Sequence, residues 1–153
     1  VPFEVYSYAT TFVDLEVDST TYETEVKHVI SAHDVGQAIN PSMVEAQIEG
    51  GVVMGLGYAL YEDVIVSRGK IKNLNFSDYI IPTCLDVPEI HPIIISSQGE
   101  SGPFGAKGVG EPALIPTIPA AIAAVNEATG ITFKKAPVLY TDIAREMNRN
   151  VER

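Results

Sequence analysis

The chain has 153 residues, which is enough for one domain with a hydrophobic core. Its net charge of −10 argues against a nucleic-acid partner, because phosphate binding requires a basic surface. Hydrophobic residues make up 46% and charged residues 20%, proportions typical of soluble globular proteins, and neither a membrane-spanning run nor a signal-peptide pattern is present. The single cysteine, Cys84, allows no internal disulfide and no cysteine metal site, which favours the reducing cytoplasm.

The beginning of the chain indicates a longer parent. It opens on Val1 rather than methionine, and a strand pattern is under way by Phe3. We therefore expect a segment of a longer polypeptide, with residues 1–153 forming a single domain.

The first elements predicted are two strands. Val13, Leu15 and Val17 alternate with acidic residues, the period-2 pattern of a half-buried strand. A second strand at Val26–Ala32 completes a hairpin over Thr10–His33, with the charged face solvated or covered by a partner.

A long helix is predicted next, after Asp34–Gly36 interrupts the second strand. It spans about Met43–Glu62, and its start admits two capping schemes. Either Asn40 caps with Pro41 at the first helical position, or Ser42 caps in a capping box with Glu45.

This helix contains glycines that oppose helix formation, so tertiary contacts must stabilise it. Gly51 and Gly55 lie on one face and permit close approach by another backbone or by a flat ligand. Gln47 lies on a face with glycines as well, and its amide could bind either a ligand or the backbone.

The remaining elements follow in chain order. They are a short strand with a turn at Arg68–Gly69, a connecting loop at Asn73–Pro82, an extended stretch at Cys84–Pro92, a strand at His91–Ser96, a helix at Ile118–Ala128 closed by Gly130, a short strand at Ile131–Phe133 and a polar helix at Thr141–Asn148.

The most informative stretch is the glycine loop, Gly99–Pro112, which carries five glycines and two prolines. It leads into a helix N-terminus, where free backbone amides suit an anion. One carboxylate, Glu111, is held between Gly110 and Pro112, either as a reactive group or as a cap of the following helix.

Other patterns in the sequence do not predict a site of their own. The letters of Gly108–Ala113 match the dinucleotide-binding motif G-x-G-x-x-A. That motif normally follows a strand and opens a helix, whereas here an irregular loop precedes it and a proline lies within it, so we do not expect a dinucleotide site. The spacing of His28, His33 and His91 indicates no metal site. Lys107 either offsets Glu111 or pairs with a surface acid.

Two long motifs carry a family resemblance. GPFGAKGVGEP (Gly102–Pro112) and DVGQAINPSMVEAQIEGGVVMGLG (Asp34–Gly57) resemble segments of the molybdenum hydroxylases, such as xanthine dehydrogenase and aldehyde oxidase. The match covers only the C-terminal part of the large molybdenum-binding subunit. It implies an α+β fold, the C-terminal portion of a molybdopterin-binding domain, with the glycine loop at the edge that meets the rest of the enzyme.

The resemblance also implies chemistry: hydroxylation of a carbon centre with oxygen from water, with Glu111 as the base. The cofactor would be molybdopterin, or its cytosine dinucleotide form. The [2Fe-2S] clusters and FAD would lie on partner subunits, and the N-terminal half of the molybdenum subunit would be a further partner. Met54 stands where relatives often have glutamine, which weakens the case for a polar contact there. The residues expected to bind the cofactor are the side chain of Gln47 and the backbone amides of Lys107, Gly108, Val109 and Gly110.

These motifs do not identify the substrate, because similar motifs occur in the members of the family that act on purines, aldehydes, nicotinate and carbon monoxide. We favour a purine such as xanthine. A different class is a non-catalytic remnant or assembly module, which would have no reason to retain Glu111, Gln47 and an intact glycine loop.

Overall fold

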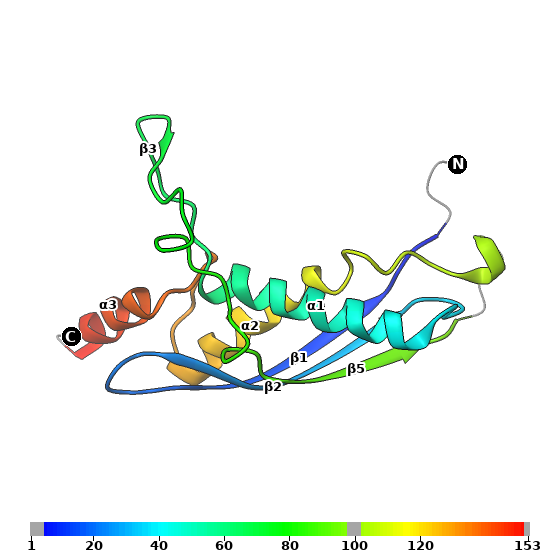
Figure 1. Cartoon of the computed structure of the whole chain (residues 1–153). Helices are drawn as coiled ribbons and strands as arrows, with labels where there is room; N and C mark the ends of the chain where they lie inside the picture. The colour runs from blue at the N-terminus through cyan, green and yellow to red at the C-terminus, as the bar shows by residue number, and fades with distance from the viewer. Residues whose placement is uncertain (1–4, 98–101, 152–153) are drawn as a thin grey trace.

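The computed structural model describes residues 5–97 and 102–151 (Figure 1). The expected strand onset at Phe3 and the first part of the glycine loop, Gly99–Ser101, lie outside the described residues. The elements are β1 (Ala9–Val17), β2 (Thr24–Asp34), α1 (Pro41–Leu60), β3 (Val66–Ser67), β4 (Lys70–Ile71), β5 (Glu89–Ile95), the 3₁₀ turn η1 (Pro103–Gly105), α2 (Leu114–Thr129) and α3 (Tyr140–Val151).

Three of the strands form one sheet, in the order β1-β2-β5. β1 and β2 form the expected antiparallel hairpin, in which Thr10 is opposite Ala32. β5 adds to the other edge of β2 in parallel, with His28 opposite Glu89. The fold is therefore α+β, as predicted.

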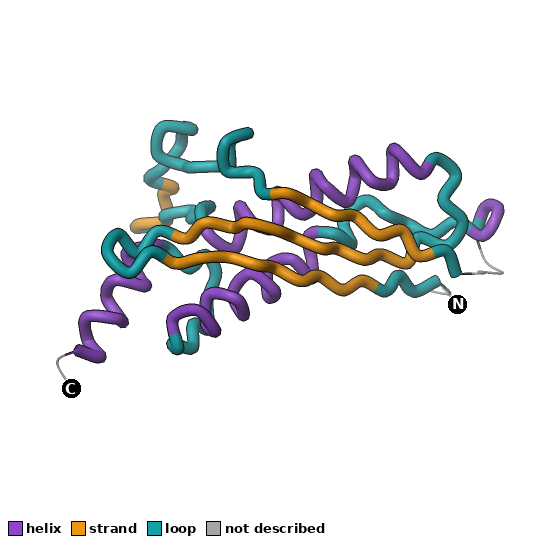
Figure 2. The backbone as a smooth tube through the Cα atoms, turned by 90° about the horizontal axis from the view of Figure 1, so that it is seen from below, coloured by secondary structure: helices purple, strands orange, loops and turns teal. Residues whose placement is uncertain are grey.

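Both long helices cover the same face of this sheet, and its other face is open (Figure 2). Within the sheet, α2 packs against β1, and α1 packs against β5 and to a lesser extent β2; the two helices also pack against each other. The burial of β2 alternates accordingly: Val29, Ser31 and His33 are buried beneath the helices, whereas His28 and Ile30 are exposed on the open face. No helix among the described residues is both long and apolar enough to cross a membrane.

The start of α1 follows the first of the two capping schemes. Asn40 is the cap, its Oδ1 accepts a hydrogen bond from the Met43 amide at 3.3 Å, and Pro41 occupies the first helical position. An asparagine in this place satisfies an amide that has no partner within the helix.

The glycines of α1 allow close packing against α2. A Cβ built on Gly51 would lie 2.6 Å from the Cβ of Ala113, and one on Gly55 would lie 2.7 Å from the Cβ of Thr117. The group that approaches these two glycines is therefore α2 rather than a flat ligand.

The structure corrects two predictions in the last third of the chain. α2 begins at Leu114 rather than Ile118, because Pro116 lies in the first turn, where a missing N–H costs no helical hydrogen bond. The expected strand at Ile131–Phe133 is wrong: the Phe133 amide binds Asn126 Oδ1 at 2.9 Å instead of a neighbouring strand. The cap at Gly130, with a φ of 68°, is confirmed.

An arm, residues 61–88, connects α1 to β5 and projects from the body (Figure 1). It contains the β3–β4 ribbon, which turns at Arg68 and Gly69 as predicted. Its apolar side chains are unusually exposed, with Leu74 at 74%, Phe76 at 78% and Leu85 at 92%.

Candidate active site

The described part of the glycine loop, residues 102–112, is held against the chain that follows β2. Gly36 and Ala106 form an isolated antiparallel bridge. Gly36 has a φ of 60°, and a Cβ there would lie 2.1 Å from the carbonyl oxygen of Gly105. Only glycine fits this position, so the two motifs singled out in the sequence meet in space.

The side chain of Lys107 anchors the loop to β2. Its Nζ lies 2.5 Å from Asp34 Oδ2 and also donates to the carbonyl oxygen of Tyr6 at 3.0 Å. Both charged side chains are only 10% exposed. Of the two roles considered for Lys107, pairing with an acid is the one observed, although the acid is largely buried rather than at the surface.

Asp34 is stabilised in its ionised form. The hydrogen bond from Lys107 lowers the pKa of Asp34 to about 2, although burial acts in the opposite direction. Ser97 Oγ and the Gly36 amide also donate to this carboxylate, at 2.7 and 3.0 Å. The sequence indicates Asp34 as the end of a strand and the start of a family motif but not as the partner of Lys107, because the two residues are distant along the chain.

The backbone amides of the loop differ in availability. The Lys107 N–H donates to the carbonyl oxygen of Val35 at 2.9 Å, so it is already engaged. The amides of Gly108, Val109 and Gly110 donate to no protein acceptor in the part of the chain that the structure describes. These three N–H groups are therefore available to a ligand, and Val109 and Gly110 line the cavity described below.

Gln47 and Glu111 flank this group of amides. Gln47 Nε2 donates to the Gly110 carbonyl at 2.8 Å, which joins α1 to the end of the loop and leaves Gln47 Oε1 available. The Glu111 side chain is exposed and accepts no hydrogen bond from the described residues. A side-chain cap by Glu111 is thus not observed, and the N-cap position of α2 is Ala113.

A cavity of about 300 Å³ lies between the glycine loop and the N-terminal end of α1. Four of the five predicted cofactor-binding residues line it: Gln47, Lys107, Val109 and Gly110. The positive end of the α1 dipole adds to the attraction for a negative group.

A larger cavity, of about 920 Å³, lies near the tip of the β1–β2 hairpin and contains none of the predicted residues. Its lining includes Glu16, Asp18, Glu23, Glu25 and Asp86. These carboxylates would repel a phosphate-bearing cofactor, so the smaller cavity is the better candidate site.

Comparisons with known proteins place the chain in a family. Residues 1–88 match the family model of the molybdopterin cofactor-binding domain. The putative xanthine dehydrogenase molybdenum-binding subunit XdhA of Escherichia coli K12 is 34% identical over 86% of the chain and 18% of its own length. The aldehyde oxidoreductase molybdenum-binding subunit PaoC of the same organism is 32% identical over 89% of the chain and 19% of its own length.

The fold is also similar to solved structures. Quinoline 2-oxidoreductase from Pseudomonas putida 86 superposes with a TM-score of 0.85 at 36% identity, over 89% of this chain and 18% of that one. The chain spans about a fifth of the length of the curated relatives that it matches.

Proposed function

The chain belongs to the molybdopterin cofactor-binding domain family, and on that premise we propose that it is the C-terminal part of the molybdenum-binding subunit of a molybdenum hydroxylase. The observation that carries this proposal is the convergence of Gln47, Val109 and Gly110 on one cavity, with the exposed Glu111 directly following Gly110 in the chain.

The residues around this cavity fit the molybdopterin cofactor, as such or as its cytosine dinucleotide. Both forms are anionic, and the site offers the amides of Gly108, Val109 and Gly110 together with the α1 N-terminus. Gln47 Oε1 adds an acceptor. When bound, the cofactor supplies the two-electron oxidation of a carbon centre, with oxygen taken from water.

Glu111 is the proposed catalytic base. Its backbone is fixed on one side by the Gln47–Gly110 hydrogen bond and on the other by Pro112. Its carboxylate is exposed and engaged by no described residue, so it is available to accept a proton from the oxygen nucleophile. General-base assistance of this kind is typically worth about a hundred- to ten-thousand-fold in rate.

The proposed partners are the N-terminal half of the large subunit, an iron–sulfur subunit and an FAD subunit. Exposed apolar residues on the arm (Leu74, Phe76 and Leu85) and on the open face of the sheet (Phe12 and Ile30) support a large covering partner.

The proposed substrate is a purine such as xanthine, which the XdhA relative supports. Another aromatic N-heterocycle is the second candidate, because quinoline 2-oxidoreductase is 36% identical. Assaying the assembled enzyme with xanthine, quinoline and an aldehyde separates these substrate classes. Absence of both turnover and co-assembly would instead support the remnant or assembly module.

The decisive test is Glu111→Gln in the complete complex. Glutamine keeps the size of the side chain but cannot accept the proton, so we expect substrate-dependent reduction to fall by about a hundredfold or more at unchanged molybdenum content. Glu127→Gln, at an exposed glutamate of α2, is the matched control and should leave the rate unchanged.

Two results would argue against this role. Near-normal reduction by Glu111→Gln with full molybdenum occupancy would remove Glu111 from the mechanism. A stability loss of about 1 kcal/mol with turnover intact would identify a helix cap instead.

A further inference from the structure

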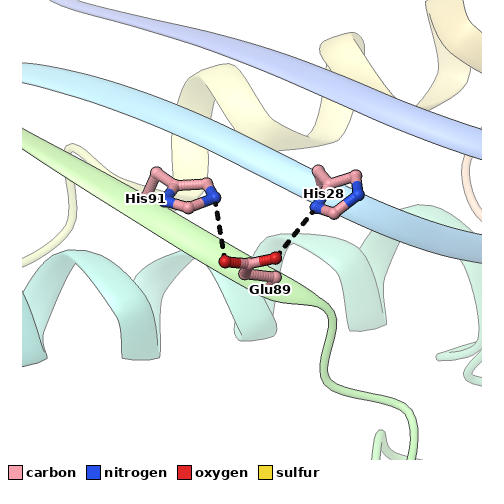
Figure 3. A group of neighbouring side chains, drawn as sticks. All are labelled: His28, Glu89 and His91. Carbon is pink, nitrogen blue, oxygen red and sulfur yellow. Dashed lines mark ion pairs between the residues drawn. The ribbon is translucent and has the colours of Figure 1, made fainter.

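Two histidines and a glutamate meet on the open face of the sheet (Figure 3). His28 Nδ1 lies 3.3 Å from Glu89 Oε2, and His91 Nε2 lies 3.3 Å from Glu89 Oε1. One nitrogen of each ring and a carboxylate oxygen all lie within 4.8 Å of one another. The three side chains therefore meet above β2 and β5, with the Glu89 carboxylate between the two rings.

The strand register places these side chains together. His28 pairs with Glu89 across the parallel β2–β5 ladder, and His91 follows two positions later on the same face. Val29, next to His28, is fully buried beneath the helices. Because successive side chains of a strand point to opposite faces of the sheet, His28 points to the open face. The cluster thus rests on paired strands rather than on a loop.

The ligand types suit a metal ion, and each imidazole nitrogen lies 3.3 Å from one of the two Glu89 oxygens. Imidazole nitrogen and carboxylate oxygen are common zinc ligands, and tetrahedral bonds of about 2.0–2.1 Å place neighbouring ligand atoms about 3.3 Å apart. The side chains are 51%, 62% and 52% exposed, so water can complete the coordination. We propose that His28, Glu89 and His91 bind one divalent transition-metal ion, with zinc as the best match.

The surrounding charge favours a cation. Asp14 is opposite His28 in the β1–β2 register and is exposed, so a second carboxylate borders the cluster. The alternative is that Glu89 only accepts hydrogen bonds from the two rings, which requires no metal. The spacing of the histidines did not indicate this site, because its ligands come from two strands separated by α1 and the arm.

This proposal is independent of molybdopterin and can be tested on the 153-residue chain itself, free of an affinity tag. Titration with Zn²⁺ against a chromophoric chelator should show one equivalent bound with a Kd in the micromolar range or tighter. Co²⁺ should give a visible absorption band when it occupies the same site. At free zinc 100 times the Kd, we expect the Tm to rise by about 5–10 °C.

Variants distinguish this site from other ligands. Glu89→Gln and His91→Asn should each weaken zinc binding at least tenfold, while far-UV circular dichroism confirms the fold. Cys84→Ser, which removes the only thiol, and Glu25→Gln, an exposed carboxylate of β2, should leave binding unchanged. No saturable binding below about 1 mM, or binding that survives both cluster variants or is lost with Cys84→Ser, would overturn the proposal.

Discussion

The carboxylate of Asp34 joins β2, the glycine loop and the end of the β5 segment. It pairs with Lys107 and accepts further hydrogen bonds from Ser97 and Gly36. Asp34→Asn would leave the largely buried Lys107 ammonium without its counter-charge, and we expect a loss of about 3 kcal/mol in the free energy of unfolding. Denaturant unfolding measures this loss. Asp78→Asn, at an exposed loop carboxylate, is the control and should change stability by less than about 0.5 kcal/mol.

The same pair predicts a pH dependence. The pKa of Asp34 is about 2 in the folded chain, below its ordinary value of 3.8, so the unfolded chain binds the proton more readily. The stabilisation is fully present above about pH 4 and is lost as the pH falls towards 2. Asparagine does not titrate, so the stability difference between wild type and Asp34→Asn should narrow by about 2 kcal/mol over this interval. A difference that stays constant would contradict the assigned ion pair.

The residues of the candidate site differ in how far the sequence reveals them. Gln47 and Glu111 could be singled out because each lies in a contiguous motif rich in glycine. Asp34 could not be matched with Lys107, because the two are 73 positions apart and no local pattern relates them.

Among the elements, the α1–α2 contact depends on two glycines but not on their neighbour Gly50. A Cβ at Gly55 would collide with Thr117, whereas one at Gly50 meets nothing within 4 Å. Gly55→Ala should therefore destabilise the chain by about 1–3 kcal/mol through overpacking. Gly50→Ala should stabilise it by about 0.5–1 kcal/mol, because alanine favours the helix.

Thermal unfolding of these two variants separates packing from helix propensity. For a chain of this length, 1 kcal/mol corresponds to about 2–4 °C in Tm. If Gly55→Ala raised the Tm as Gly50→Ala does, α1 and α2 would not be as close as the structure has them.

Element prediction succeeded where the pattern is local and failed where it is not. The β1–β2 hairpin and α1 follow from alternation, a cap and helical length. The parallel pairing of β5 with β2 brings together segments separated by α1 and the arm, so no local signal encodes it. The predicted start of α2 at Ile118 is too late, because the first turn of the helix accommodates Pro116.

At the scale of the whole molecule, the proposed cofactor site is only partly supplied by this chain. Its cavity of about 300 Å³ is lined by the glycine loop, the segment between β2 and α1, and the start of α1, and the chain spans about a fifth of its relatives' length. We expect the purified chain to contain far less than one molybdenum atom per molecule, as measured by mass spectrometry of the metal. Stoichiometric molybdenum in a preparation free of partners would contradict this expectation.

The arm is the second feature at this scale. Its residues Leu74 and Phe76 are 74% and 78% exposed, and burying one such side chain in an interface is worth about 1.5–3 kcal/mol. The double variant Leu74→Ser/Phe76→Ser should therefore weaken binding to the rest of the large subunit by at least about tenfold. The variant's own Tm should change little, because these side chains contact mainly solvent in the isolated chain. Ile115→Ser, at a residue of α2 that is 67% exposed, serves as the matched control. If binding were unaffected by the arm variant, or equally weakened by Ile115→Ser, the arm would not be the specific contact, and the partner would have to be held by the open face of the sheet.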